Sequence, residues 1–173
     1  MSSALTLPNA LSLGRLLLTL PLAWALAENR PVVGIPLFAL AVASDLLDGR
    51  LARARGQTTR LGTLLDHGAD ACLVVTLSAG AAMLGLLPAA LAPLIAFAFV
   101  QYVLDSRVID GAPLKGSRLG RWNGIAYYVA AGGALAARHL GSPPALVGIL
   151  HVLGWLLVAS TLLSIAARLR AIR

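Results

Sequence analysis

The chain has 173 residues, of which 58% are hydrophobic and 12% are charged, and its mean hydropathy is +0.83. This composition excludes an ordinary soluble domain, because so few charged side chains cannot cover a water-exposed surface. The formal net charge of +7 fits attraction to anionic lipid headgroups better than nucleic-acid binding, for which the chain carries no recognisable motif. We therefore expect an integral membrane protein that binds membrane lipids and no nucleic acid.

Glycine, proline and charged residues divide the chain into six apolar segments, each of the length that a helix needs to cross the hydrocarbon core. The first segment contains Arg15 and is followed by further spans, so we interpret it as a retained helix and not as a signal peptide. The expected fold is an all-α integral membrane protein, a bundle of six transmembrane helices that forms a single domain over residues 1–173. The expected spans are residues 10–27, 32–51, 61–86, 89–105, 120–138 and 144–167.

Basic residues indicate the orientation, because under six spans they fall overwhelmingly on one side of the membrane. Only Arg30 and Arg138 fall on the other side. By the positive-inside rule, the basic side is cytoplasmic, and it holds both termini. We expect a multi-pass protein of the plasma or inner membrane whose site opens at the cytoplasmic face. The basic residues assigned to this face are Arg15, Arg50, Arg53, Arg55, Arg60, Arg107, Lys115, Arg118, Arg121, Arg168, Arg170 and Arg173.

Two pairs of carboxylates, Asp45/Asp48 and Asp66/Asp70, flank the connection between the second and third spans. An ionisable residue at membrane depth costs roughly 2.5 to 3.5 kcal/mol on insertion scales, so such a group needs a compensating role. Helical spacing places each pair on one stripe of its helix, and we expect the two stripes to face each other. Oxygen ligands without a Cys/His cluster favour Mg²⁺ or Mn²⁺ over zinc. The sequence therefore predicts a divalent-metal site.

The connection between the two stripes is rich in arginine, and a divalent metal beside arginines suggests a phosphate substrate. Arg53 follows Asp48 by five residues and can lie at the rim of its stripe, which favours a functional role. The other arginines of this connection are explained by topology or by lipid headgroups. His67 lies between Asp66 and Asp70, and we interpret it as a residue lining the cavity more readily than as a metal ligand.

The segment from Asp45 to Asp70 resembles the signature of the CDP-alcohol phosphatidyltransferase family, DxxDGxxARx(8)GxxxDxxxD. All eight defined positions and every spacing match. A second resemblance lies at the N-terminus, where LPNALSLGR is similar to the PNxxTxxR of many family members, with serine in place of threonine. The matching residues are Asp45, Asp48, Gly49, Ala52, Arg53, Gly62, Asp66 and Asp70 in the signature, and Pro8, Asn9, Ser12 and Arg15 in the N-terminal motif.

This resemblance implies an enzyme of phospholipid synthesis that transfers a phosphatidyl group from a CDP-linked donor, commonly CDP-diacylglycerol, to an acceptor hydroxyl and releases CMP. It further implies two Mg²⁺ (or Mn²⁺) ions, held by the four aspartates, and Asp70 as the general base. The family pattern places the nucleotide beside small residues of the second and third spans and the donor phosphates near the first. The donor-binding residues implied are Asn9, Arg15, Gly49, Ala52, Arg53 and Gly62.

The identity of the acceptor is expected to depend on the second cytoplasmic stretch, residues 105–124, whose basic residues suit a phosphorylated alcohol such as glycerol 3-phosphate or inositol phosphate. The segment LGRWNGIAY departs from the LGKxxTxxQ expected of phosphatidylglycerolphosphate synthases, with Gly124 and Tyr127 at the last two defined positions. Glycines in this region and at 132 and 133 predict close helix contacts, and family members are often homodimers. The acceptor-binding residues expected are Arg107, Lys115, Arg118 and Arg121.

Three other interpretations explain the sequence less completely. A small cation transporter explains the aspartates but not the spacing of the glycines, Ala52 and Arg53. A non-catalytic membrane scaffold would be the natural interpretation if one of the signature aspartates had been replaced, and none has been. A UbiA-type prenyltransferase requires an NDxxDxxxD motif and a second acidic motif later in the chain, and neither is present.

Overall fold

The computed structural model describes residues 7–55, 60–105 and 118–171, which form helices joined by short connections and contain no strand. An all-α fold is therefore confirmed for the described part of the chain. Each helix overlaps one expected segment, and no boundary moves by more than about one helical turn. The helices are α1 (Leu7–Ala27), α2 (Pro31–Arg55), α3 (Arg60–Met83), α4 (Leu91–Asp105), α5 (Arg118–His139) and α6 (Pro144–Ala171).

The sequence explains where several helices begin and end. Pro31 and Pro144 open α2 and α6, where the missing N–H costs no hydrogen bond. The helices α1, α3 and α5 each close with a backbone bond that spans five residues, as in Arg30 N to Ala25 O at 2.8 Å. A residue with positive φ precedes each of these donors, and at the end of α3 it is Gly85, with φ of 70°. These compact endings make the connections at one end of the bundle short.

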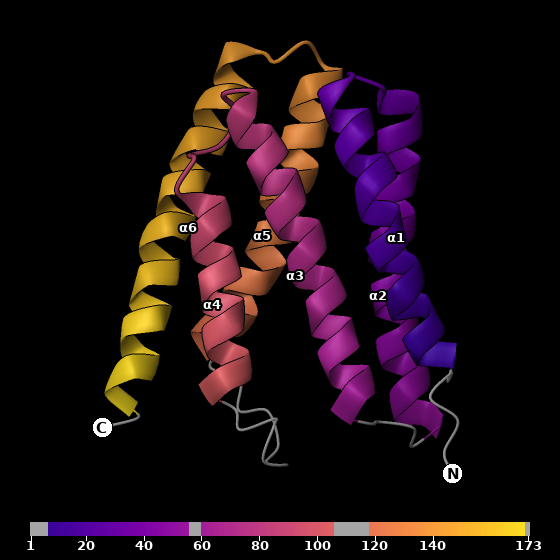
Figure 1. Ribbon diagram of the computed structural model, residues 1–173. Coiled ribbons are helices and arrows are strands. Elements are labelled where there is room, and N and C mark those ends of the chain that lie inside the picture. The colour runs from indigo at the N-terminus through magenta and orange to yellow at the C-terminus, as the bar shows by residue number, and fades with distance from the viewer. Residues whose placement is uncertain (1–6, 56–59, 106–117, 172–173) are drawn as a thin grey trace.

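The six helices form two overlapping groups (Figure 1). One contains α1, α2, α3 and α5, and the other contains α3, α4, α5 and α6. Helix α1 packs against both α2 and α3, whereas α4 packs against α3 and α6, and α5 contacts α2, α3 and α6. Among the described residues, α2 and α3 make few contacts with each other, and both pack against α1 and against α5. The first residue of α1 and the last of α6 lie at the same end of the bundle, the lower end in Figure 1.

Apolar side chains fill the interior and also cover much of the exterior. Leu22, Leu73 and Leu77 are buried in a core shared by α1, α3 and α5, while Val32 and Leu20 remain 85% and 74% exposed. Two helical stretches have the length and hydropathy of a membrane span, Asn9–Ala27 and Pro144–Arg170, and two shorter apolar stretches are Pro31–Leu47 and Leu91–Leu104. Large exposed apolar surfaces of this kind are consistent with a lipid environment.

Glycines allow α5 to approach its neighbours closely, as the sequence predicted for residues 132 and 133. A Cβ atom added at Gly132 would lie 2.8 Å from Phe38 Cε1 on α2, and one at Gly133 would lie 2.9 Å from Leu150 Cδ2 on α6. Gly124 differs, because a Cβ atom there would meet no atom of the described residues within 4 Å. The two packed glycines therefore hold α5 between α2 and α6.

Candidate active site

A stripe of polar residues on α1 faces the interior of the bundle. Asn9, Ser12, Arg15 and Thr19 follow a spacing of three or four residues, which places them on one helical face, and all four are buried. Arg15 is completely buried, with an exposed fraction of 0%. A buried guanidinium needs opposite charges around it, because removing a charge from water without compensation is very costly.

Three aspartates supply that opposite charge, and they come from two different helices. The Nη1 atom of Arg15 lies 3.2 Å from Oδ1 of Asp45 on α2 and 3.1 Å from Oδ1 of Asp66 on α3. The same nitrogen also forms an ion pair with Oδ1 of Asp70, one turn further along α3. Three carboxylate oxygens therefore surround a single cationic nitrogen.

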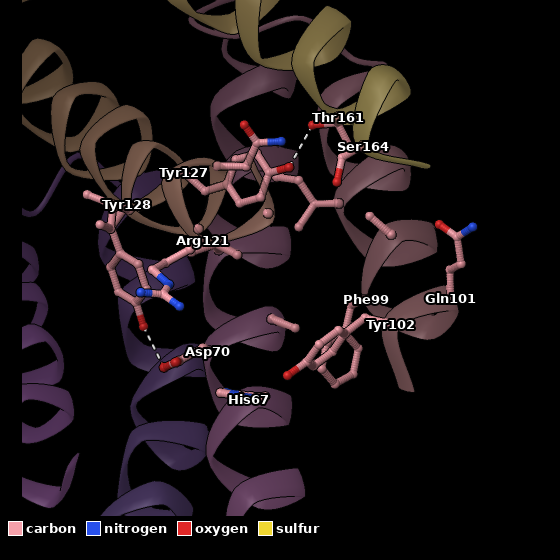
Figure 2. A pocket seen from close by; sticks show the side chains of 18 of the residues that line it. His67, Asp70, Phe99, Gln101, Tyr102, Arg121, Tyr127, Tyr128, Thr161 and Ser164 are labelled. Atoms are coloured by element: carbon pink, nitrogen blue, oxygen red, sulfur yellow. Dashed lines mark hydrogen bonds between the residues drawn. The ribbon is translucent and has the colours of Figure 1, made fainter. Parts of the chain in front are cut away.

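Hydroxyl groups complete the surroundings of these charges. Ser12 Oγ donates to Asp66 Oδ1 at 3.4 Å, and Arg15 Nε donates to Ser44 Oγ at 3.5 Å. Tyr128 on α5 donates its hydroxyl to Asp70 Oδ1 at 2.7 Å, as Figure 2 shows. Asp70 is thus held from α1 and from α5 at once.

A cavity of about 690 Å³ adjoins the aspartates and extends between α3, α4, α5 and α6. Asp45, Asp70 and Arg121 are among the residues that line it. Figure 2 shows that side chains of α3, α4, α5 and α6 surround the same space. The guanidinium carbon of Arg168 lies 5.0 Å from the centre of the Tyr102 ring, which brings a second positive charge to the cavity wall. The lining of the cavity therefore combines carboxylates, cations and hydroxyl groups.

The sequence profile of the CDP-alcohol phosphatidyltransferase family matches residues 5–166, which is nearly the whole chain. The chain belongs to this family. Residues of the matched segment include every aspartate described above.

Curated relatives of the chain are phospholipid-synthesis enzymes by name. Cardiolipin synthase (CMP-forming) of Streptomyces coelicolor is 37% identical over 92 residues, which cover 49% of this chain and 42% of the relative. CDP-diacylglycerol–glycerol-3-phosphate 3-phosphatidyltransferase of Salmonella typhimurium is 40% identical over 76 residues, which cover 39% of each protein. The matches thus span less than half the length of these relatives. No solved structure is significantly similar to the chain.

The donor set of this member of the CDP-alcohol phosphatidyltransferase family fits a divalent cation. One ligand atom from each of Asp66, His67 and Asp70 can be chosen so that all three lie within 4.8 Å of one another. Asp45 Oδ1 approaches the same nitrogen of Arg15 as Asp66 and Asp70 do, so a third carboxylate is available. Carboxylate oxygens are the ligands that Mg²⁺ and Mn²⁺ prefer, and the positive charge of Arg15 occupies the centre of this oxygen set.

Several residues expected from the sequence meet here and others do not. Asp45 from α2 and Asp66 and Asp70 from α3 lie together, with the guanidinium of Arg15 from α1 among their carboxylates. Arg121 lines the cavity, whereas Arg118 is exposed at the start of α5 and does not line it. Asn9 lies buried on the same face of α1 as Arg15, and Gly62 lies in the first turn of α3. The side chains of Asp48, Gly49, Ala52 and Arg53, and the whole of Arg107 and Lys115, lie outside the described part of the structure.

Sequence reasoning missed the contributions of α4 and α6 and, on α5, that of Tyr128. Tyr128 was not among the expected site residues, yet it donates a hydrogen bond to Asp70. Its spacing from Arg121 and Gly124 is i, i+3, i+7, so these residues share one helical face and this signal was available. Tyr102 and Arg168 carry no comparable signal, because only the packing of α4 against α6 brings them to the cavity.

Proposed function

We propose that this chain transfers a phosphatidyl group from CDP-diacylglycerol to the hydroxyl of an acceptor alcohol and releases CMP. The observation that carries the proposal is the convergence of Asp45, Asp66 and Asp70, three signature aspartates from two helices, on one point beside a large cavity. Family membership supports the reaction class. The names of the relatives, which include a CMP-forming synthase and a phosphatidyltransferase, support the donor.

In this reaction the acceptor oxygen attacks the phosphorus of the phosphatidyl group. A P–O bond forms to the acceptor as the bond between that phosphorus and the bridging oxygen breaks, and CMP leaves with the bridging oxygen. Two Mg²⁺ or Mn²⁺ ions, when bound, neutralise the diphosphate and the charge that develops on the leaving phosphate. We assign their binding to Asp45, Asp48, Asp66 and Asp70.

Asp70 is the proposed general base that takes the proton of the acceptor hydroxyl. Its carboxyl group lines the cavity and accepts a hydrogen bond from Tyr128, so it meets the requirement that a base be fixed near its substrate. Proton transfer by a positioned side chain contributes typically about 10²- to 10⁴-fold to the rate.

The donor is assigned to the α1, α2 and α3 side of the site. Small residues at positions 49, 52 and 62 leave room for the nucleotide, Arg53 carries charge for its phosphate, and Asn9 and Arg15 come from the buried face of α1. An arginine suits this role because its planar guanidinium can hold a phosphate with two hydrogen bonds.

The acceptor is assigned to the cavity between α3 and α6. We propose a glycerol-based alcohol, either glycerol 3-phosphate, which the name of one relative specifies, or phosphatidylglycerol. Inositol phosphate remains a competitor because it would use the same charges. Arg121 and Arg168 at the cavity wall supply positive charge for an acceptor phosphate. Arg107, Lys115 and Arg118 belong to the same stretch as Arg121, residues 105–124.

We further propose that the chain is one domain of six transmembrane helices, acts as a homodimer, and carries its site at the cytoplasmic face of the cell membrane. The exposed apolar side chains of α1, α2 and α6 support several spans, because water would not tolerate so large an apolar surface. The basic residues near one end of the bundle support the orientation.

The deciding experiment is a transfer assay with the purified full chain in detergent or nanodiscs. CDP-diacylglycerol, Mg²⁺ and single acceptors from the panel glycerol 3-phosphate, phosphatidylglycerol and inositol phosphate are supplied, and CMP and the lipid product are identified by mass spectrometry. We expect CMP release with one acceptor and none without it. Release of no CMP across the panel, together with ion flux in liposomes, would favour the transporter; neither activity would favour the scaffold.

Replacing the proposed base provides the sharpest variant. Asp70→Asn is nearly isosteric but removes the charge that accepts the proton, so we expect CMP release to fall at least about 100-fold. Glu28→Gln is the matched control, because Glu28 is exposed in the connection between α1 and α2 and does not line the cavity. Full activity of Asp70→Asn would show that Asp70 does not take the proton of the acceptor hydroxyl.

A further inference from the structure

Arg15 is the most unusual charged residue of this molecule. It is completely buried, it comes from α1, and its Nη1 atom contacts one oxygen from each of Asp45, Asp66 and Asp70. Its Nε atom is also engaged, by Ser44 Oγ at 3.5 Å. A residue that only contacted donor phosphates would not need three aspartates around one nitrogen.

The oxygens that contact Arg15 are those that a divalent cation would use. Magnesium binds its oxygen ligands at about 2.0 to 2.1 Å, so an ion shared by these carboxylates must lie among them. The Nη1 atom lies among the same oxygens, at 3.1 Å and 3.2 Å from two of them. The ion and this nitrogen therefore need the same space, and two positive charges in contact also repel each other.

The placement of α1 gives this competition a structural consequence. Helix α1 packs against both acidic helices, α2 and α3. The guanidinium that joins Asp45 to Asp66 and Asp70 thus belongs to a third helix. Loss of these contacts removes the ion pairs that link α1 to α2 and to α3.

We propose that Arg15 is a positioning residue that serves as an internal counter-ion: its guanidinium holds the three carboxylates together, and a divalent cation displaces it when it binds them. The displaced guanidinium then donates hydrogen bonds to the anionic diphosphate of the donor lipid. Cation binding therefore precedes tight binding of that lipid. This inference rests on the proposed function for the identity of the site. Competition between Arg15 and the metal ion for the carboxylates is not described by the family signature.

Binding of Mn²⁺ to the purified full chain tests the proposal without an activity assay, because free Mn²⁺ is measured directly by electron paramagnetic resonance. Arg15→Met keeps much of the length of the side chain and removes its charge. We expect it to bind Mn²⁺ at least ten-fold more tightly than the unaltered protein. We also expect a lower melting temperature without Mn²⁺, recovered when Mn²⁺ is added.

Two further variants keep the test decisive. Arg15→Lys retains a positive charge, is expected to fold without Mn²⁺, and should bind Mn²⁺ more tightly than the unaltered protein because an ammonium group cannot reproduce the reach of the guanidinium. Arg30→Met removes an exposed arginine between α1 and α2 and should change neither Mn²⁺ affinity nor melting temperature.

Mn²⁺ affinities of both Arg15 variants at or below that of the unaltered protein would overturn the proposal, and so would absence of Mn²⁺ binding in all of them. The CMP assay separates this result from the proposed function. Tighter Mn²⁺ binding with no CMP release in any acceptor panel refutes the transfer reaction alone. CMP release with unchanged Mn²⁺ affinity refutes the role of Arg15 alone.

Discussion

Asp70 receives hydrogen bonds at a single carboxylate oxygen from two directions. Arg15 approaches from α1 and Tyr128 from α5, and both contact Oδ1. The tyrosine is itself held by its neighbours, since its ring lies 6.3 Å from that of Phe38 on α2. The orientation of the proposed base is therefore set by side chains of three other helices, and not only by the backbone of α3.

Removing the tyrosine hydroxyl isolates this orienting effect. We expect Tyr128→Phe to lower kcat for CMP release about ten-fold while KM for the acceptor changes little, because the base remains but is no longer fixed. The loss of one hydrogen bond to a charged group should cost about 1.5 to 3 kcal/mol of stability. Steady-state kinetics and thermal unfolding measure the two effects.

Ser160→Ala provides the comparison for that variant. It removes the hydrogen bond from Ser160 Oγ to Asn123 Oδ1, 2.6 Å long, which also joins α5 to another helix but does not involve an aspartate. This variant should lose stability without the decrease in kcat. An equal decrease in kcat for both variants would mean that Tyr128 acts only by holding the helices together.

At the scale of the elements, α5 depends on close approach to α2 and α6. Gly132 faces the Phe38 ring, and Gly133 faces the Leu150 side chain. Because α5 also carries Tyr128 and part of the cavity wall, its distance from α2 affects the site as well as the core. Two packed glycines therefore connect helix packing with the geometry around Asp70.

Adding one methyl group at this contact tests the connection. Gly132→Ala should destabilise the protein by about 1 to 3 kcal/mol, because the Phe38 ring must move to admit the new atom. Gly148→Ala on α6 should be neutral or stabilising by up to about 1 kcal/mol, since its Cβ would meet no atom of the described residues within 4 Å. Thermal unfolding in detergent compares them, and equal stability would contradict tight packing at Gly132.

For the molecule as a whole, the two ends of the bundle differ in character. At one end the helices α1, α3 and α5 close in compact turns, and this end carries Arg30 and Arg138 as its basic residues. At the other end lie the start of α1 and the end of α6 (Figure 1). Among the described residues, Arg55, Arg60 and Arg118 are the terminal residues of α2, α3 and α5 at this end, and Arg170 is in the last turn of α6. The positive-inside rule then predicts that the second end faces the cytoplasm.

Labelling in intact cells tests this orientation. In a Cys72→Ser background, Glu28→Cys should react with a membrane-impermeant maleimide, because Glu28 is exposed in the connection between α1 and α2. Arg170→Cys, exposed in the last turn of α6, should react only after the membrane is permeabilised. The reverse pattern of labelling would place the acidic site on the outer face.

By itself, the sequence determined the helical segments and the chemistry of the site. Long apolar runs interrupted by glycine, proline and charge define helices with little ambiguity, and the signature aspartates specify oxygen ligands at helical spacing. Asp45, Asp66 and Asp70 were therefore predicted to meet, and their side chains do meet. The expected boundaries also agree with the helices to within about one turn.

Only the tertiary structure decided which helices surround those aspartates. Hydropathy gives the length of a helix but not its neighbours, so the packing of α1 against both α2 and α3, and with it the contacts of Arg15 with the aspartates, was not predicted. The same holds for Tyr128 and Arg168, whose positions depend on how α5 and α6 pack. The physical reason is that side-chain contacts between distant segments depend on the packing of complementary surfaces, which a linear pattern of polarity does not specify.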